Sequence, residues 1–194
     1  MEKRVIRKNE ILRDSIKLMY LKGYNSTSVN DIAQAASIPK GSFYNYFRDK
    51  EHYAVDAVEY YRSVIVKDNL AVLSNAGIAP IDRIKSFYIC GIDKLIEHDY
   101  KLGCFASNLA QEMGDISDSI SGAISEFYDH VTHLVYLNLL EARDNGDLND
   151  EHDLKSLAGF IISAWQGTQM RAKVTRSRKT LDEFLYILND VILK

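Results

Sequence analysis

The sequence predicts an all-α protein, and three observations lead to this fold class. The chain of 194 residues contains only two prolines and ten glycines, so it lacks the turn residues that a sandwich or barrel needs. Apolar residues recur at steps of three and four in its main segments, as in amphipathic helices. The composition, 46% hydrophobic and 26% charged, is that of a globular protein with its own core.

The first expected helices are one long and two short. The long one runs from about Lys3 to Lys22 and ends at Gly23; its apolar positions are Ile11, Leu12, Ile16, Met19 and Tyr20. A short helix follows over about 30–36, and Ser28 with Asp31 three positions later resembles a capping box. After a break at 37–39, a second short helix is expected over 40–47, with Pro39 at its start.

The remaining helices are longer. A helix is expected over about 50–73, and a linker follows with Gly77 and Pro80. Further helices are expected over about 80–98, 103–113, 117–144, 151–172 and 180–193, which makes nine in all. We divide the chain into two domains, residues 1–49 and residues 50–194.

Charge is distributed unevenly along the chain. The net charge is −3, which taken alone argues against a nucleic-acid partner. Residues 1–50, however, carry ten Lys or Arg and five Asp or Glu, whereas the rest carries 14 basic and 22 acidic residues. A basic N-terminal part on an acidic body indicates a polyanion partner for the first 50 residues.

The two short helices form a helix-turn-helix pattern. Helices of about seven residues are too short to be stable alone, so they must pack on the helix before them. Ala33 is expected where they cross, while Ile38, Phe43 and Phe47 point into the core. The second helix would then enter the major groove of DNA. From spacing alone, the pattern also fits a plain three-helix cap on an all-α protein.

The residues of this pattern also resemble a known family. The stretch Gly23-Tyr24, Ser26 to Ala33 and then Ile38-Pro39-Lys40-Gly41-Ser42-Phe43-Tyr44-Asn45-Tyr46-Phe47-Arg48-Asp49-Lys50-Glu51 is similar to the tetracycline-repressor family of bacterial transcription regulators. The resemblance covers about residues 8–55. It departs from the family at Ser37, where glycine is common, and at Pro39. A weaker resemblance, from Leu102 to Glu112, is to regulators that include sensors of reactive electrophiles.

The resemblance implies a homodimer that represses a promoter and releases its double-stranded operator DNA when a small-molecule effector binds. Ser28 and Tyr44 would hold phosphates, together with the backbone or ammonium of Lys50. Other residues would approach base edges or the flanking backbone: Asn30, Lys40, Gly41, Ser42, Asn45 and Tyr46. Lys40 suits guanine and Asn45 suits adenine.

The body is expected to bind the effector and to form the dimer. Candidate ligand residues are Tyr61, Phe87, Cys104, Phe105, Asn108, Trp165 and Gln166. The last two helices are expected to join a second copy in a four-helix bundle. The residues assigned to that interface are Trp165, Leu181, Phe184, Leu185, Leu188 and Ile192.

Several other patterns have competing interpretations. His130 and His133 have a metal-binding spacing but no visible third ligand, so no metal or cofactor is expected. Cys90 and Cys104 are either a redox pair or buried apolar residues, and Cys104 is the better candidate for an electrophile or redox sensor. The basic run from Arg171 to Lys179 is either a second DNA patch or a solvated connection.

Other functional classes find less support. The chain has no glycine-rich phosphate loop, nucleophile elbow or metal-ligand set, so we expect no enzymatic activity. A ligand-binding protein of the same fold that has lost operator binding is the rival hypothesis, and the intact polar face of 40–46 argues against it. No apolar run is long enough to span a membrane and no secretory signal is visible, so we expect a cytoplasmic protein.

Overall fold

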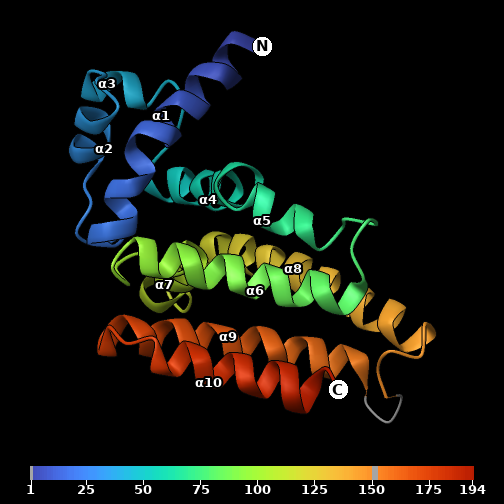
Figure 1. Ribbon diagram of the computed structural model, residues 1–194. Coiled ribbons are helices and arrows are strands. Elements are labelled where there is room, and N and C mark those ends of the chain that lie inside the picture. The colour runs from blue at the N-terminus through green and yellow to red at the C-terminus, as the bar shows by residue number, and fades with distance from the viewer. Residues whose placement is uncertain (1, 150–152) are drawn as a thin grey trace. The chain divides into compact units, whose positions relative to one another are not determined.

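The computed structural model describes residues 2–149 and 153–194. Within these residues the chain is entirely helical, which confirms the predicted fold class (Figure 1). They form ten α-helices and two π-helical turns: α1 (Glu2–Lys22), α2 (Val29–Ala35), α3 (Lys40–Phe43), α4 (Lys50–Tyr60), η1 (Tyr61–Ile65), α5 (Lys67–Val72), α6 (Pro80–Glu97), α7 (Phe105–Met113), α8 (Asp118–Asp144), α9 (Leu154–Thr175), α10 (Lys179–Ile187) and η2 (Leu188–Ile192).

Three expected helices differ from those observed. The helix expected over 50–73 is interrupted by η1 and by Val66, so α4 and α5 are separate and the described part has ten helices rather than nine. Within η1 the hydroxyl of Ser63 donates to the carbonyl of Glu59, a side-chain bond that competes with regular helix geometry. The second short helix ends at Phe43 instead of 47, and the last ends in the π-turn η2. Residues 151–152 of the expected helix 151–172 lie outside the described residues.

The described chain separates into two compact units. Unit 1 comprises residues 1–65 and 105–127, and unit 2 comprises residues 66–104 and 128–194. The division into residues 1–49 and 50–194 follows the family resemblance, whereas these units follow packing. Helix α7 and the start of α8 therefore pack with the N-terminal helices.

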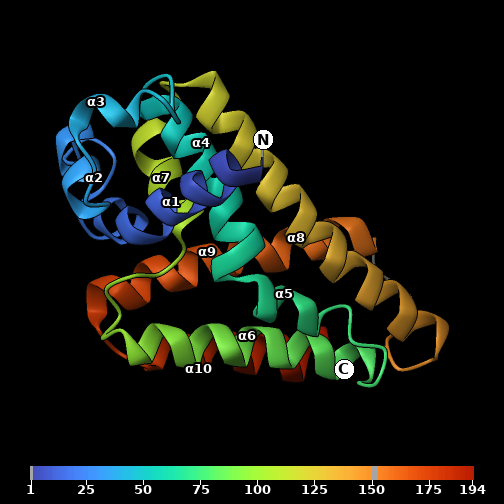
Figure 2. The same ribbon diagram turned by 90° about the horizontal axis from the view of Figure 1, so that it is seen from above.

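Unit 1 is built around the inner face of α1. Ile11, Leu12, Ile16 and Met19 are buried there, as their spacing predicts. Figures 1 and 2 both show α2 and α3 beside α1. The rings that fill the centre are Phe43, Phe47 and Tyr53.

Unit 2 is organised by a buried arginine and an aromatic cluster. Arg83 on α6 donates to the carbonyls of Asn75 and Ile78 at 2.7 Å and forms an ion pair with Glu141 on α8 at 2.6 Å. Elsewhere in the unit, the ring of Tyr88 contacts those of Trp165 and Phe184 edge to face. These contacts tie α6 to α8, α9 and α10. In the part of the chain that the structure describes, no helix is long and apolar enough to cross a membrane.

Candidate nucleic-acid interface

Helix α2 begins with the capping box that the sequence predicts. The Ser28 hydroxyl accepts from the N–H of Asp31 at 3.1 Å, and the Asp31 carboxylate accepts from the N–H of Ser28 at 2.8 Å. The hydroxyl also donates to that carboxylate at 2.6 Å, and these bonds lower the Asp31 pKa. The hydroxyl and the backbone N–H of Ser28 are therefore both hydrogen-bonded within the protein, whereas we expected Ser28 to contact a phosphate.

The turn between α2 and α3 contains a left-handed residue. Ser37 has a φ of +53°, a conformation in which glycine is favoured. This is the position where the sequence departs from the family's usual glycine. The N–H of Ile38 bonds to the carbonyl of Ala33 at 2.9 Å, so the turn closes tightly. Pro39 supplies the extended residue before α3, with φ −59° and ψ 142°.

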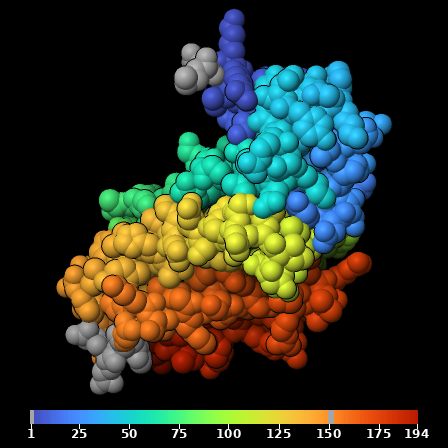
Figure 3. All heavy atoms as spheres, turned by 180° about the vertical axis from the view of Figure 1, so that it is seen from behind, coloured from blue at the N-terminus to red at the C-terminus, as the bar shows by residue number. Residues whose placement is uncertain are grey.

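Helix α3 and the residues that follow it, as far as Phe47, present a polar outer surface over an aromatic inner one. Phe43 and Phe47 are fully buried, as predicted. Tyr44 is 53% exposed, and its ring is held edge to face against Phe43. Of the other residues expected to contact DNA, the exposed ones are Asn30, Lys40, Gly41 and Asn45, and the half-exposed ones are Ser42 and Tyr46. Atoms of α2 and α3 lie at the surface in Figure 3 (light blue).

Gly41 leaves open space on this surface. A Cβ added there would meet no other atom within 4 Å. The backbone of α3 is therefore accessible at this residue, as a close approach to DNA requires.

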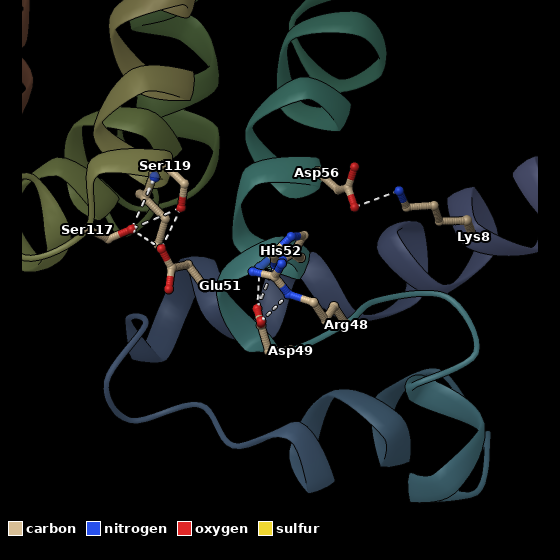
Figure 4. A network of polar contacts seen from close by, with 9 residues as sticks. Lys8, Arg48, Asp49, Glu51, His52, Asp56, Ser117 and Ser119 are labelled. Carbon is tan, nitrogen blue, oxygen red and sulfur yellow. Dashed lines mark hydrogen bonds and ion pairs between the residues drawn. The ribbon is translucent and has the colours of Figure 1, made fainter.

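The first turns of α1 contact the segment that follows α3. Arg4 donates from Nη2 to the carbonyl of Asn45 at 2.8 Å. One turn later, the Lys8 ammonium lies 5.4 Å from the centre of the Phe47 ring and pairs with Asp56 at 2.6 Å (Figure 4). We did not single out Arg4 from the sequence, because nothing local links it to residue 45.

The N-terminus of α4 is capped by Asp49. Its carboxylate accepts from the N–H and ring Nδ1 of His52 at 2.8 and 2.9 Å, and from Arg48 at 3.0 Å (Figure 4). These hydrogen bonds hold the Asp49 pKa well below its usual range. The Lys50 ammonium donates to the carbonyls of Tyr24 and Thr27 at 3.0 Å each. The sequence suggests either the ammonium or the backbone N–H of Lys50 as a phosphate contact. The ammonium is bonded within the protein, which leaves the backbone N–H at the N-terminus of α4 as the better candidate.

The expected ligand residues fall into two aromatic groups, one in each unit. In unit 1, Tyr61 and Phe105 have ring centres 5.7 Å apart, and both contact Tyr20. Asn108 follows on the same helix as Phe105. In unit 2, Phe87 packs against Tyr88, which contacts Trp165. Gln166 and Cys104 also belong to unit 2, and both are half-buried.

The residues expected at a dimer interface are mostly internal. Leu181 and Leu188 are fully buried within their own chain, and Trp165 and Phe184 are nearly so. Leu185 and Ile192 are half-buried. The four buried residues therefore have little or no exposed surface to offer a second copy. They form the contact between α9 and α10 and the core beneath it.

Cys104 directly precedes α7 and has a cation nearby. The interaction with Cys104 raises the Lys173 pKa, although burial of Lys173 has the larger, lowering effect. The lysine side chain passes close to Gly103, whose φ is +73°. Sequence spacing does not reveal this pairing. Cys90 and Cys104 are both free thiols, and within the described residues no group of three or more His, Cys, Asp or Glu is placed to hold a metal.

These features define the class of the protein. Two short helices joined by a tight turn, with apolar rings inside and a polar surface outside, form a helix-turn-helix DNA-binding domain. The family described as "Bacterial regulatory proteins, tetR family" matches residues 11–52, and "Tetracyclin repressor-like, C-terminal domain" matches residues 80–188. The chain belongs to the tetracycline-repressor family of transcriptional regulators.

Named relatives match this chain over most of its length. The transcriptional repressor DhaR of Mycobacterium sp. strain GP1 is 28% identical over 172 residues, covering 89% of this chain and 85% of the relative. The repressor NemR of Escherichia coli K12 is 25% identical over 185 residues, covering 95% and 93%. The crystal structure of reduced E. coli NemR superposes with a TM-score of 0.88 at 25% identity, covering 96% of each chain. The structure of a TetR regulatory protein from Rhodobacter sphaeroides gives a TM-score of 0.86 at 28% identity, covering 94% and 97%.

Proposed function

We propose that this protein is a homodimeric repressor that binds an operator through α3 and releases it when a small molecule binds the C-terminal helices. The observation that carries the proposal is the surface of α3. Here and in the residues that directly follow α3, Phe43 and Phe47 point inward, whereas Lys40, Tyr44 and Asn45 are exposed on a part of the chain that is rich in Lys and Arg.

The exposed groups have different roles on DNA. Lys40 and Asn45 carry the groups that read guanine and adenine edges in the major groove. The Tyr44 hydroxyl and the backbone N–H of Lys50 suit phosphate oxygens, which fix the position of the protein without reading sequence. Asn30, Gly41, Ser42 and Tyr46 complete the surface, and Ser28 acts chiefly through the cap of α2.

The experiment is selection of bound sequences from random DNA, followed by anisotropy titrations of the selected duplex and a scrambled one. We expect one enriched sequence with two related half-sites, because each copy contributes one recognition helix. Affinity should fall steeply with salt as counterions are released. Equal binding of both duplexes at every salt concentration would contradict an operator-binding function.

A second copy is the occupant that best fits the outer face of the last two helices. Along α9, the exposed residues Phe160, Met170 and Val174 follow a helical stripe, and Gly167 lies within it with open space at its Cβ position. Along α10 and η2, Tyr186, Ile187 and Val191 are also exposed. Large exposed apolar side chains along neighbouring helices are typical of an interface, and the family resemblance implies a homodimer.

The effector is proposed to be a largely apolar small molecule with polar groups. Each aromatic group described above offers apolar contacts within its own unit, and each unit also holds a candidate hydrogen-bonding side chain, Asn108 in unit 1 and Gln166 in unit 2. A ligand can release DNA only to the extent that it prefers the non-binding state, which corresponds to about 1–3 kcal/mol in typical systems.

A second candidate mechanism is electrophile sensing by Cys104, and the specific observation that favours it is Lys173. Reactive cysteines typically lie in electropositive, partly exposed surroundings. Cys104 is a half-buried free thiol that interacts with Lys173 and directly precedes α7. Alkylation would place a new group directly before Phe105.

A further inference from the structure

The turn between α1 and α2 is held by a residue far outside the helix-turn-helix. The carboxylate of Glu112 on α7 accepts from two successive backbone amides, the N–H of Tyr24 at 3.1 Å and the N–H of Asn25 at 2.9 Å. These partners are 88 and 87 residues away along the chain, and all three residues belong to unit 1. Charge-assisted hydrogen bonds of this kind are stronger than bonds between neutral groups.

Gly23 makes this close approach possible. Its φ is +85°, and an added Cβ would collide with the Glu112 carboxylate. Two features therefore favour glycine after the end of α1: the positive φ of its backbone, and the space that the missing side chain leaves for the Glu112 carboxylate. The residue is part of the contact as well as a helix terminator.

Lys50 holds the same turn through its other polar groups. Its ammonium donates to the carbonyls of Tyr24 and Thr27 and lies 4.0 Å from the centre of the Tyr24 ring. The N–H groups of the turn thus face an anion and its carbonyls face a cation. The two charges also interact electrostatically. Burial lowers the Lys50 pKa, and the nearby Glu112 carboxylate partly offsets this by raising it.

We propose that Glu112 is a positioning residue for operator binding. The turn that it holds leads directly to Ser28, the N-cap of α2, and α2 packs against α3. Fixing the turn therefore fixes the path by which the recognition surface joins α1. This inference rests on the proposed operator-binding function, and it adds a residue of α7 to the groups that set affinity for DNA.

A charge effect of Glu112 and a positioning role of Glu112 predict opposite changes in DNA affinity for Glu112→Gln. Replacing Glu112 with Gln removes a negative charge from a protein that binds a polyanion, so electrostatics alone would strengthen binding. Positioning predicts weaker binding, since glutamine has one acceptor oxygen and would turn an NH₂ group toward a backbone N–H. The sign of the change separates the two explanations.

The experiment compares Glu112→Gln with wild type and with Glu126→Gln, an exposed acid of the same segment. It measures affinity for the selected operator, the salt dependence of binding and amide hydrogen exchange at Tyr24 and Asn25. For Glu112→Gln we expect at least a fivefold loss of affinity, faster exchange at both amides and an unchanged salt slope. For Glu126→Gln we expect unchanged or slightly tighter binding and wild-type exchange.

Two results would overturn the inference: Glu112→Gln binding as tightly as wild type, or amide exchange at Tyr24 and Asn25 that does not change. If Glu112→Gln does not fold, Glu112→Asp keeps the charge but is one methylene shorter, and the same loss of affinity is expected. A wild-type protein that shows no sequence preference would contradict the proposed function itself, which is a separate outcome.

Discussion

The hydroxyl of Ser15 on α1 and the phenol of Tyr53 on α4 are 2.7 Å apart, and neither side chain has exposed surface. Ser15 also bonds to the carbonyl of Ile11 at 2.6 Å. A hydroxyl has one proton, and Ser15 donates its proton to the Ile11 carbonyl. The Tyr53 phenol is therefore the donor in its hydrogen bond to Ser15. Burial raises the Tyr53 pKa well above its usual value, although the bond to Ser15 opposes this shift.

We expect the two ends of this bond to tolerate substitution unequally. Ser15→Ala leaves a buried phenol without an acceptor, which costs about 1–3 kcal/mol of unfolding free energy. Tyr53→Phe leaves Ser15 bonded to Ile11 and removes one donor, so its cost should be smaller, about 1 kcal/mol. Urea denaturation of both variants checks the order, and a larger loss for Tyr53→Phe would contradict it.

The cap of α4 predicts a pH dependence. The Asp49 pKa is lowered in the folded state by bonds from the His52 N–H, the His52 ring and Arg48. A lowered folded-state pKa stabilises the fold above the unfolded value of about 3.9, and this contribution is lost as the pH falls below it. Asp49→Asn keeps a capping side chain but removes the charge. Since the side chain is 44% exposed, we expect a loss of about 1 kcal/mol or less at pH 7.

The measurement is the unfolding free energy of wild type and Asp49→Asn at pH 7 and at pH 3. The difference between the two proteins should shrink at the lower pH, because the Asp49 carboxylate of the unfolded wild-type chain takes up a proton there while the folded one stays ionised. An equal difference at both values would show that the charge of Asp49 does not contribute.

On the recognition surface, base contacts and phosphate contacts should respond differently to substitution. Lys40→Ala and Asn45→Ala should change which bases are selected, with about 1–3 kcal/mol of lost discrimination at the affected position. Asn45→Ala keeps the backbone carbonyl that Arg4 holds, so the local backbone contact is retained. Tyr44→Phe removes only an exposed hydroxyl and should weaken binding to all sequences alike. Repeating the selection with each variant checks this, and an unchanged preference for Asn45→Ala would exclude base reading by Asn45.

For the dimer, the informative substitution is at Val174, which is 81% exposed. A charge introduced by Val174→Asp would be buried unpaired in the proposed interface, so we expect a folded monomer. Ile89→Asp on α6 is the matched control, because Ile89 is also a large exposed apolar residue, and it should remain dimeric. Light scattering after size exclusion measures both masses. Leu188 is unsuitable for this test, since a charge at a fully buried position would disrupt the chain itself.

For the cysteine mechanism, the informative pair is Cys104→Ser and Lys173→Met. If Cys104 senses electrophiles, N-ethylmaleimide should release wild-type protein from its operator and leave Cys104→Ser bound. Lys173→Met should react more slowly, because reactive cysteines lie in electropositive surroundings and this variant removes the neighbouring cation. Cys90→Ser should behave like wild type. Release of Cys104→Ser by the same reagent would rule out Cys104 as the sensor.

The sequence predicts most of the DNA-binding part because its signals are local. Capping by Ser28 and Asp31, the inward rings of Phe43 and Phe47, and the unusual Ser37 all depend on neighbours within a few residues. The family resemblance then assigns the exposed face. The break at η1 has no glycine or proline to mark it, so periodicity continues through it.

Long-range contacts are the part that the sequence leaves open. Nothing near Glu112 indicates that it binds the amides of Tyr24 and Asn25, and nothing near Lys173 indicates Cys104. Helix α10 is apolar on more than one side, with Leu181 buried and Tyr186 exposed. Periodicity shows that such a helix has apolar surface, but it does not show which side faces its own chain.

Residues 105–127 pack with residues 1–65, which affects how family members can be recombined. A chimaera joined at residue 49 or 65 would place a foreign α7 against the α1–α2 turn. It would also remove Ser117 and Ser119, whose hydroxyls donate to Glu51 at the start of α4 (Figure 4). A DNA-binding unit that is to be transferred intact therefore consists of two segments, residues 1–65 and residues 105–127. An exchange of operator specificity between relatives must transfer both segments.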